Sequence, residues 1–180
     1  DISDMTQYNL RELMGFVPQK AVLFSGTIRD NMQYGKPDAT DEMIWKALEI
    51  AQAKDFVSEM EDGLDSHVEQ GGGNFSGGQR QRLAIARALV KTADIYVFDD
   101  SFSALDFKTD ANLRQALKTN MKESITVLVA QRVSTVMDAD MILVLDEGKL
   151  VGKGTHEELL ATNETYQEIV HSQLREEDLA

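Results

Sequence analysis

The chain has 180 residues, which is enough for one substantial hydrophobic core with a small appended subdomain. Its 18 Lys and Arg residues face 31 Asp and Glu residues, and the resulting net charge of −13 argues against a general nucleic-acid-binding or anionic-membrane-binding surface. The absence of cysteine excludes disulfides and thiolate metal sites, and we expect neither a membrane span, since no apolar run approaches ~18 residues, nor a signal peptide.

The first predicted elements are a short strand and a helix. Gly15 to Val17 reads as a strand that the following proline stops, and Gln19 stands just past its end. Position alone favours a plain loop amide for Gln19. A helix is predicted from Ile28, capped by Ser25 or Thr27 and ended by a glycine and a proline.

Two further helical segments and a glycine-rich loop come next. Thr40 is the predicted cap of a helix with two acids in its first turn, and a shorter helical piece covers 53–60. The loop from Gly63 to Gly73 shows no periodicity. The longer helix has one apolar stripe at helical spacing, which we interpret as core: Met43, Ile44, Ala47, Leu48 and Ala51.

The next segment combines a helix start with bare backbone amides. Ser76 is a natural N-cap, Gly77 and Gly78 leave their N–H groups unshielded, and a helix is predicted over 80–89. A helix N-terminus of this kind can bind an anion such as a phosphate, because its amides point outward and its dipole end is positive. The alternative is that these residues only cap the helix.

Short apolar strands and helices alternate in the rest of the chain. Strands are predicted at 95–99, 125–130 and 141–145, and helices at 110–117 and 134–138. Near-continuous apolar strands separated by helices favour a parallel sheet covered on both faces. A hairpin turn at 146–149, a capping box at Thr155 to Glu158 and a helical stretch at 165–174 complete the predicted elements.

An acidic pair ends the strand at 95–99. Asp99 and Asp100 stand at its C-terminal end, where open α/β sheets bind their ligands. A strand-end Asp is often only a helix cap, but carboxylate oxygen is also the ligand that Mg²⁺ prefers. An anion site and a magnesium site in one chain indicate a nucleotide-binding protein.

Five segments in matching order and spacing resemble the motifs of the ABC family of ATP-binding cassettes. They are Val17-Pro18-Gln19 for the Q-loop, Phe75-Ser76-Gly77-Gly78-Gln79 for the signature, Ile95 to Asp99 for the Walker B strand, Ser103-Ala104-Leu105-Asp106 for the D-loop and Val129 to Thr135 for the switch segment. The resemblance covers essentially the whole chain. The segments Leu23 to Asn31 and Gly154 to Leu159 further resemble the exporter branch.

The resemblance implies a role for each matching residue. Asp99 would hold Mg²⁺, and Gln19 would reach the metal or the attacking water. Asp100 and Gln131 would act on that water and on the phosphate. The residues that would contact ATP held by an opposite subunit, or bridge the two subunits, are Ser76, Gly77, Gly78, Gln79 and Asp106.

The chain departs from the family pattern in three places. It has no Gly-x-x-x-x-Gly-Lys-Ser/Thr segment, so we expect a cassette without its N-terminal strands and P-loop that binds ATP weakly or not at all by itself. Asp100 stands where the family has Glu, and Gln131 where it has His. Both changes weaken hydrolysis, because Asp is one methylene shorter and Gln cannot titrate.

The predicted fold is a three-layer α/β P-loop NTPase core with a mostly helical subdomain. Residues 1–26 would be a core remnant with the Q-loop, 27–90 the helical subdomain with the signature, and 91–180 the C-terminal core. The pattern resembles the degenerate-site subunit of heterodimeric ABC exporters. Its partners would be a second, different cassette and the transmembrane domains, with no nucleic acid, at the cytoplasmic face of a membrane.

Two other functions stay open on the sequence. A soluble ABC ATPase of DNA maintenance would need a basic surface or long coiled-coil arms, and this acidic chain shows neither. A non-hydrolysing, nucleotide-gated interaction module would explain Asp100 and Gln131 as signs of lost catalysis. Stimulation of ATP turnover by transported substrates separates these functions from an exporter.

Overall fold

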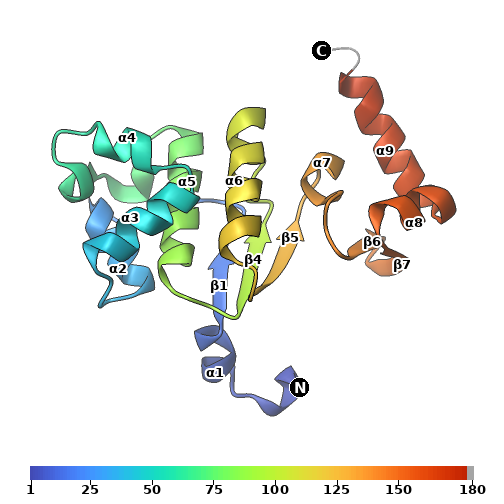
Figure 1. Cartoon of the computed structure of the whole chain (residues 1–180), viewed down its shortest axis with the longest axis horizontal. Helices are drawn as coiled ribbons and strands as arrows, with labels where there is room; N and C mark the ends of the chain where they lie inside the picture. The colour runs from blue at the N-terminus through green and yellow to red at the C-terminus, as the bar shows by residue number, and fades with distance from the viewer. Residues whose placement is uncertain (178–180) are drawn as a thin grey trace. The chain divides into compact units, whose positions relative to one another are not determined.

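The computed structural model describes residues 1–177, and the chain divides into two units, Asp1–Val129 and the part from Ala130 onward (Figure 1). The three-part division at residues 26 and 90 stays a prediction, and its last residues, 178–180, lie outside the described part. Within that part, every helix is too short or too polar to cross a bilayer.

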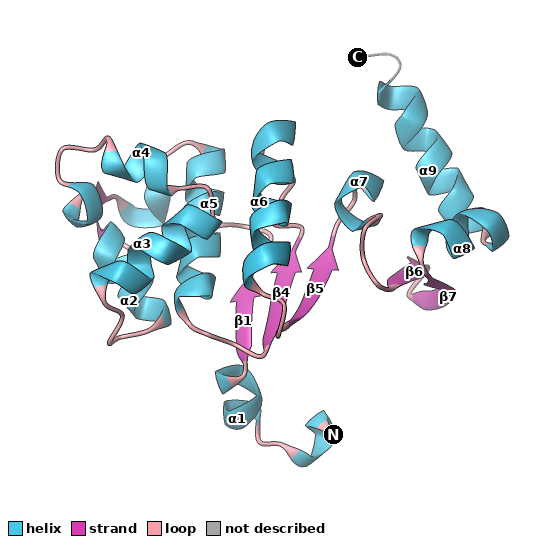
Figure 2. Ribbon diagram, viewed as in Figure 1, coloured by secondary structure: helices cyan, strands magenta, loops and turns pink. Residues whose placement is uncertain are grey.

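Three parallel strands form the sheet of the first unit (Figure 2). Their order is β1 (Met14–Val17), β4 (Ile95–Asp99) and β5 (Ile125–Val129), with β4 in the middle. The register pairs Val17 with Phe98 and Asp99 with Val129. Because the strands are parallel, their carboxyl ends meet at one edge of the sheet, and the residues that follow them are brought together there. The prediction of a parallel sheet is confirmed for these strands.

Five helices follow β1 in the first unit: α2 (Ile28–Gly35), α3 (Asp41–Ile50), α4 (Lys54–Ser58), α5 (Gly77–Val90) and α6 (Phe107–Asn120). Four of these helices begin with a side-chain cap, in which a side-chain oxygen accepts a backbone N–H that has no partner within the helix. The capping residues are Thr27 for α2, Thr40 for α3, Ser76 for α5 and Asp106 for α6. The predicted caps at Thr27, Thr40 and Ser76 are therefore confirmed.

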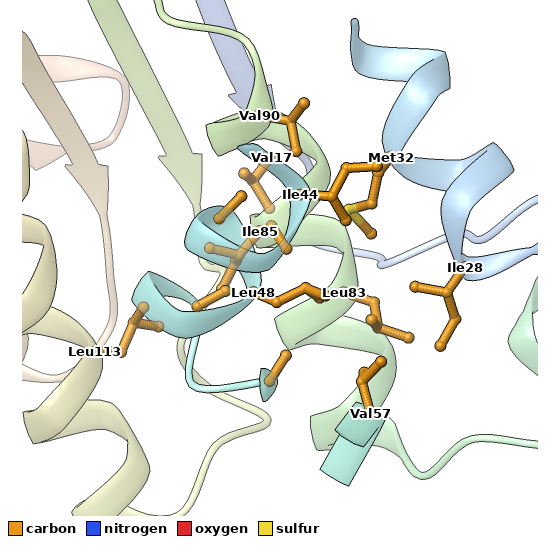
Figure 3. Close-up of a cluster of buried hydrophobic side chains, with 14 of the residues drawn as sticks. Val17, Ile28, Met32, Ile44, Leu48, Val57, Leu83, Ile85, Val90 and Leu113 are labelled. Carbon is orange, nitrogen blue, oxygen red and sulfur yellow. The ribbon is translucent and has the colours of Figure 1, made fainter. Parts of the chain in front are cut away.

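The core of this unit lies between α5 and its neighbours (Figure 3). Leu83 and Ile85 of α5 are buried against residues of α2 and α3, including Ile28, Ile44 and Leu48. The apolar stripe predicted for 43–51 is buried as expected at four of its five positions, and its first residue is half-buried. Burial of this helix face fixes the direction of α5, and with it the position of the helix start at Ser76.

The two faces of the sheet differ within the described residues. Tyr96 and Phe98 of β4 are buried in the helical core, whereas Phe16 of β1 and Val127 of β5 are 54% and 43% exposed. The apolar strands predict a sheet covered on both faces, and the absence of the P-loop strand and helix predicts that its apolar face is exposed; the exposed side chains of Phe16 and Val127 agree with the second expectation. The strands are apolar on both sides, but the helices between them pack on the Tyr96 side.

Several short elements were missed by the sequence analysis. Helix α1 (Gln7–Glu12) precedes β1, and the glycine-rich loop holds β3 (His67–Val68), which pairs antiparallel with β2 (Gly26–Thr27). The 3-10 turns are η1 (Ile2–Asp4), η2 (Gly63–Asp65) and η3 (Gln70–Gly72). A two-residue strand is too short to show a period, so its pairing partner alone defines it.

The second unit contains α7 (Val133–Val136), β6 (Ile142–Asp146), β7 (Lys149–Gly154), α8 (His156–Thr162) and α9 (Glu164–Glu177). The predicted hairpin and the capping box between Thr155 and Glu158 are confirmed. Within this unit β6 pairs antiparallel with β7, because a tight turn with a left-handed Gly148 returns the chain directly. A small core forms around Val144, Leu159, Tyr166 and Val170.

Candidate functional site

The end of β1 and the end of β4 meet through two predicted site residues. The side-chain amide of Gln19 donates from Nε2 to Oδ2 of Asp100 over 3.0 Å, although 81 positions separate them. Gln19 is exposed and Asp100 is half-buried. The parallel register explains the contact, since Val17 lies beside Phe98 and both chains leave the same edge of the sheet. Gln19, whose position in the sequence favoured a plain loop residue, thus contacts the second acid of the pair.

Ser101 secures this edge and was missed by the sequence analysis. Its side chain is fully buried, and its hydroxyl lies 3.1 Å from the carbonyl oxygen of Val17 and 3.2 Å from that of Asp99. Ser101 therefore joins the end of β1 to the end of β4. Its acceptor on β1, Val17, lies two residues before Gln19, and its acceptor on β4, Asp99, belongs to the acidic pair. The only signal in the sequence is a small hydroxyl residue directly after two strand-end acids.

Asp100 has an unusual backbone conformation. Its φ is +43°, in the left-handed region, and its N–H donates to the carbonyl oxygen of Val129 over 2.8 Å. Ser103 donates its hydroxyl to the carbonyl oxygen of Asp100 over 3.0 Å. Asp enters the left-handed region more readily than most residues, because its short polar side chain can hydrogen-bond locally. The turn directs the chain from β4 toward Ser103 to Asp106.

The oxygen groups at this edge suit a hard divalent cation. The carboxylate of Asp99 ends β4, and because the amide nitrogen of Gln19 is engaged by Asp100, its amide oxygen remains available as a ligand. No cluster of three or more His, Cys, Asp or Glu side chains with metal-binding geometry occurs in residues 1–177. A few protein oxygens supplemented by water and phosphate are the usual environment of Mg²⁺, so the residues fit this ion.

The second group of predicted site residues lies at the start of α5. The hydroxyl of Ser76 accepts the N–H of Gln79 over 3.2 Å, and Oε1 of Gln79 accepts the N–H of Ser76 over 2.9 Å. This is a reciprocal capping box. Gly77 and Gly78 occupy the first turn, where N–H groups have no acceptor within the helix. The capping role is therefore real, and it leaves the first-turn amides directed at whatever lies beyond the helix end.

The start of α5 lies against the segment before α6. A Cβ atom added to Gly78 would be 3.4 Å from the carbonyl oxygen of Ala104 and 3.9 Å from Leu105. Asp106 caps α6: its carboxylate accepts the N–H of Thr109 over 2.9 Å and its hydroxyl over 2.7 Å. The bond from the backbone N–H of Thr109 is the largest cause, and the bond from its hydroxyl the next, of a pKa of Asp106 that lies below its usual value. The predicted signature and D-loop residues are thus neighbours within one unit.

Three arginines of α5 brace the surrounding backbone. Arg80 donates to the carbonyl oxygens of Gly72 and Phe75, and Arg87 donates to that of Val22 over 2.8 Å. Arg82 donates to Gln52 over 2.6 Å, and its guanidinium lies 4.8 Å from the ring centroid of Phe56. Burial lowers the pKa of Arg82 and Arg87. The hydrogen-bond partners of the three arginines are backbone carbonyl oxygens and, for Arg87, also the side-chain oxygen of Asn31.

Gln131 lies in the second unit, just before α7. Its carbonyl oxygen accepts Nε2 of Gln173 over 2.5 Å, and Oε1 of the same Gln173 side chain accepts the N–H of Val133 over 2.8 Å. Gln131 belongs to the unit that begins at Ala130, whereas Asp99 and Asp100 belong to the other unit. The structure therefore brings together Gln19 with Asp100, and Ser76 to Gln79 with the D-loop residues.

A family model described as "ABC transporter" matches residues 1–103. An ABC transporter ATP-binding protein of Mycobacterium bovis is 49% identical over 176 residues, covering 94% of this chain and 30% of that protein. A multidrug resistance ABC transporter ATP-binding and permease protein of Lactococcus lactis is 41% identical over 174 residues, with 96% and 30% covered.

Solved structures give the same result. A bacterial Atm1-family ABC exporter with ATP bound superposes with a TM-score of 0.92 and 39% identity, covering 97% of this chain and 31% of that one. The chain thus spans about three tenths of the length of the proteins it matches.

Proposed function

The chain belongs to the ABC transporter family, and from this premise we propose that it is part of an exporter's ATP-binding cassette, coupling ATP binding and hydrolysis to solute export. The observation that carries the proposal is the hydrogen bond between Gln19 and Asp100. It joins the residue that matches the family's Q-loop to the residue beside the matching Walker B strand. The likeness to an exporter with ATP bound supports the export function.

We assign the metal and the attacking water to the edge of the sheet. Asp99 and the amide oxygen of Gln19 would hold Mg²⁺, which neutralises phosphate charge when it is bound. Asp100 would orient the attacking water through its carboxylate. Gln131 would donate a hydrogen bond to a phosphate oxygen, but it cannot shuttle a proton.

We assign a different nucleotide to the start of α5. The amides of Gly77 and Gly78 and the hydroxyl of Ser76 would bind the γ-phosphate of ATP held by a partner cassette, with Gln79 fixing the cap. Asp106, which closes the segment packed against Gly78, would lie at the seam between the two cassettes. The chain would thus complete a site that it does not itself contain.

The two assignments describe an asymmetric transporter. The signature residues match the family, whereas Asp100 and Gln131 depart from it at the positions that act on the water. We therefore propose that the chain pairs with a different cassette, holds ATP at a slow site and completes a fast one. Its place would be the cytoplasmic face of a membrane, next to the transmembrane domains of the exporter.

Restoring the family residues tests the asymmetry. In the full-length transporter, Asp100→Glu with Gln131→His should raise single-turnover hydrolysis at the slow site by up to about 10²-fold, the effect of correcting a misplacement near 1 Å. The matched control is Asp94→Glu with Gln115→His at two exposed positions of the first unit. An unchanged rate at the slow site would count against the slow-site assignment.

Nucleotide affinity tests a second consequence. The sequence contains no P-loop, so the 180-residue polypeptide should bind ATP with a Kd above about 1 mM. Isothermal titration calorimetry with MgATP measures this directly. A sub-millimolar Kd would contradict the expectation and would require a phosphate cradle elsewhere in the chain.

A further inference from the structure

One side chain of α9 makes two hydrogen bonds to the switch segment. The Gln173 amide donates to the carbonyl oxygen of Gln131 over 2.5 Å and accepts the N–H of Val133 over 2.8 Å. These two backbone groups flank Arg132, so both bonds fix the same short stretch of chain. The carbonyl belongs to Gln131 itself, the residue at the switch position of this family.

The chemistry of the contact requires a primary amide. In a parallel sheet, the N–H and the C=O of one residue bond to the two residues that flank its partner on the next strand: the N–H donates to the carbonyl oxygen of the preceding residue, and the C=O accepts the N–H of the following one. The side-chain amide of Gln173 makes the same pair of bonds to Gln131 and Val133, which flank Arg132. A carboxylate could accept from Val133 but could not donate to Gln131, and an aliphatic side chain could do neither. The Val133 N–H is the first of α7, whose N-cap residue provides no side-chain acceptor.

The rest of α9 explains why the amide is held there. Tyr166 and Val170 are buried in the core of the second unit, and Gln173 follows one turn later on the same helix face. Val133 and Val136 of α7 pack against that core. The helix that carries Gln173 is thus anchored by apolar contacts to the element that its amide caps, which limits how far the amide can move.

We propose that Gln173 is a positioning residue that holds the backbone of Gln131 and so sets where the Gln131 side chain can reach. This proposal rests on the function proposed for Gln131 at the nucleotide. Without the two bonds, the segment between β5 and α7 loses its fixed point, and Gln131 samples positions from which a phosphate oxygen is out of reach. A displacement near 1 Å at a reacting group lowers rates strongly.

Hydrogen exchange tests the structural half of the proposal in the full-length transporter. In Gln173→Leu, the backbone amides of residues 131–136 should exchange about fivefold faster than in wild type, the effect of losing about 1 kcal/mol of protection. The matched control is Gln167→Leu, since Gln167 lies on the same helix and donates to the carbonyl oxygen of Leu160. Gln173→Glu keeps the size of the side chain and its acceptor for the Val133 N–H but loses the donor to Gln131, so it should show a smaller increase in the same residues, which covers the case of a poorly folding Leu variant.

A double-mutant cycle tests the catalytic half. Single-turnover hydrolysis at the site of Asp100 should fall about 3- to 10-fold in Gln173→Leu and in Gln131→Ala. The double variant should be no slower than Gln131→Ala, because a residue that acts through Gln131 has nothing left to position. A merely structural contribution of Gln173 would instead multiply the two effects.

The outcomes separate this proposal from the function it rests on. Unchanged exchange in both Gln173 variants overturns the positioning role, whatever the rates are. Faster exchange with a normal rate in Gln131→Ala overturns the function proposed for Gln131, and the catalytic part of the proposal with it. Faster exchange, a slower Gln131→Ala and a multiplicative double variant overturn the action through Gln131 and leave the proposed function intact.

Discussion

The start of α5 and the end of β4 carry the two main groups of predicted site residues, and they are held in place by different means. At the start of α5, Ser76 and Gln79 satisfy each other within four residues. At the end of β4, Asp100 accepts a hydrogen bond from Gln19, which is 81 positions away in the sequence. Ser101 donates to the carbonyl oxygen of Val17, which is 84 positions away. One site is built locally and the other by the sheet.

The difference indicates how each site tolerates change. A capping box on a long helix with a buried face keeps its geometry as long as the helix is packed. The edge of the sheet depends on the register of β1 against β4 and on a left-handed Asp100. We expect changes at α5 to alter ligand binding without unfolding, and changes near β4 to alter both.

The largest expected effect is at the locally built site. Ser76→Arg should lower steady-state ATPase activity of the full-length transporter by more than about 10²-fold, because a long cation would fill the space in front of the first-turn amides of α5. Ser58→Arg, at the exposed last residue of α4, is the control and should retain activity. Activity above half of wild type in Ser76→Arg would remove the start of α5 from the catalytic site.

The next effect is on stability at the sheet edge. Ser101→Ala should lower the free energy of unfolding of the chain by about 1–3 kcal/mol, because the buried carbonyl group of Val17 and the part-buried one of Asp99 lose a shared donor. Urea denaturation measures the change. Ser58→Ala removes an exposed hydroxyl that donates to Asp55 and should cost less than about 0.5 kcal/mol. Equal losses in the two variants would mean that Ser101 does not secure the edge.

A smaller effect is expected from the exposed contact between Gln19 and Asp100. Gln19→Leu removes a hydrogen bond worth about 0.5–1.5 kcal/mol and should slow single-turnover hydrolysis at the site of Asp100 about 3- to 10-fold. Gln115→Leu, exposed on α6, should leave the rate unchanged. If the rate in Gln19→Leu equals that of the control, the contact does not position Asp100 for catalysis.

The smallest effect is a pH dependence at the cap of α6. Hydrogen bonds from Thr109 depress the pKa of Asp106, so this group favours the folded state above its unfolded pKa of about 3.9, and that contribution is lost as the pH falls through the folded value. In Asp106→Asn, which can still cap the helix, the unfolding midpoint should fall less steeply below about pH 4. Parallel curves for variant and wild type would exclude this linkage.

The locally built features could be predicted from the sequence. The caps at Thr27, Thr40 and Ser76 and the bounds of β4 were found because each signal lies within a few residues. The roles of Ser101 and Gln173 were not found, because each depends on a backbone group that the fold brings from a distant part of the chain. The exposed apolar face of the sheet follows from the missing P-loop segment, but apolar strands do not reveal which side the helices cover.

The most direct test of the proposed asymmetry is a comparison of the two nucleotide sites in the full-length transporter. Single-turnover hydrolysis is measured separately at the site that contains Asp100 and at the site completed by Ser76 to Gln79. We expect the first to be slower by about 10²-fold, since its carboxylate stands more than an ångström back from the usual position. Equally fast hydrolysis at both sites would contradict the proposal.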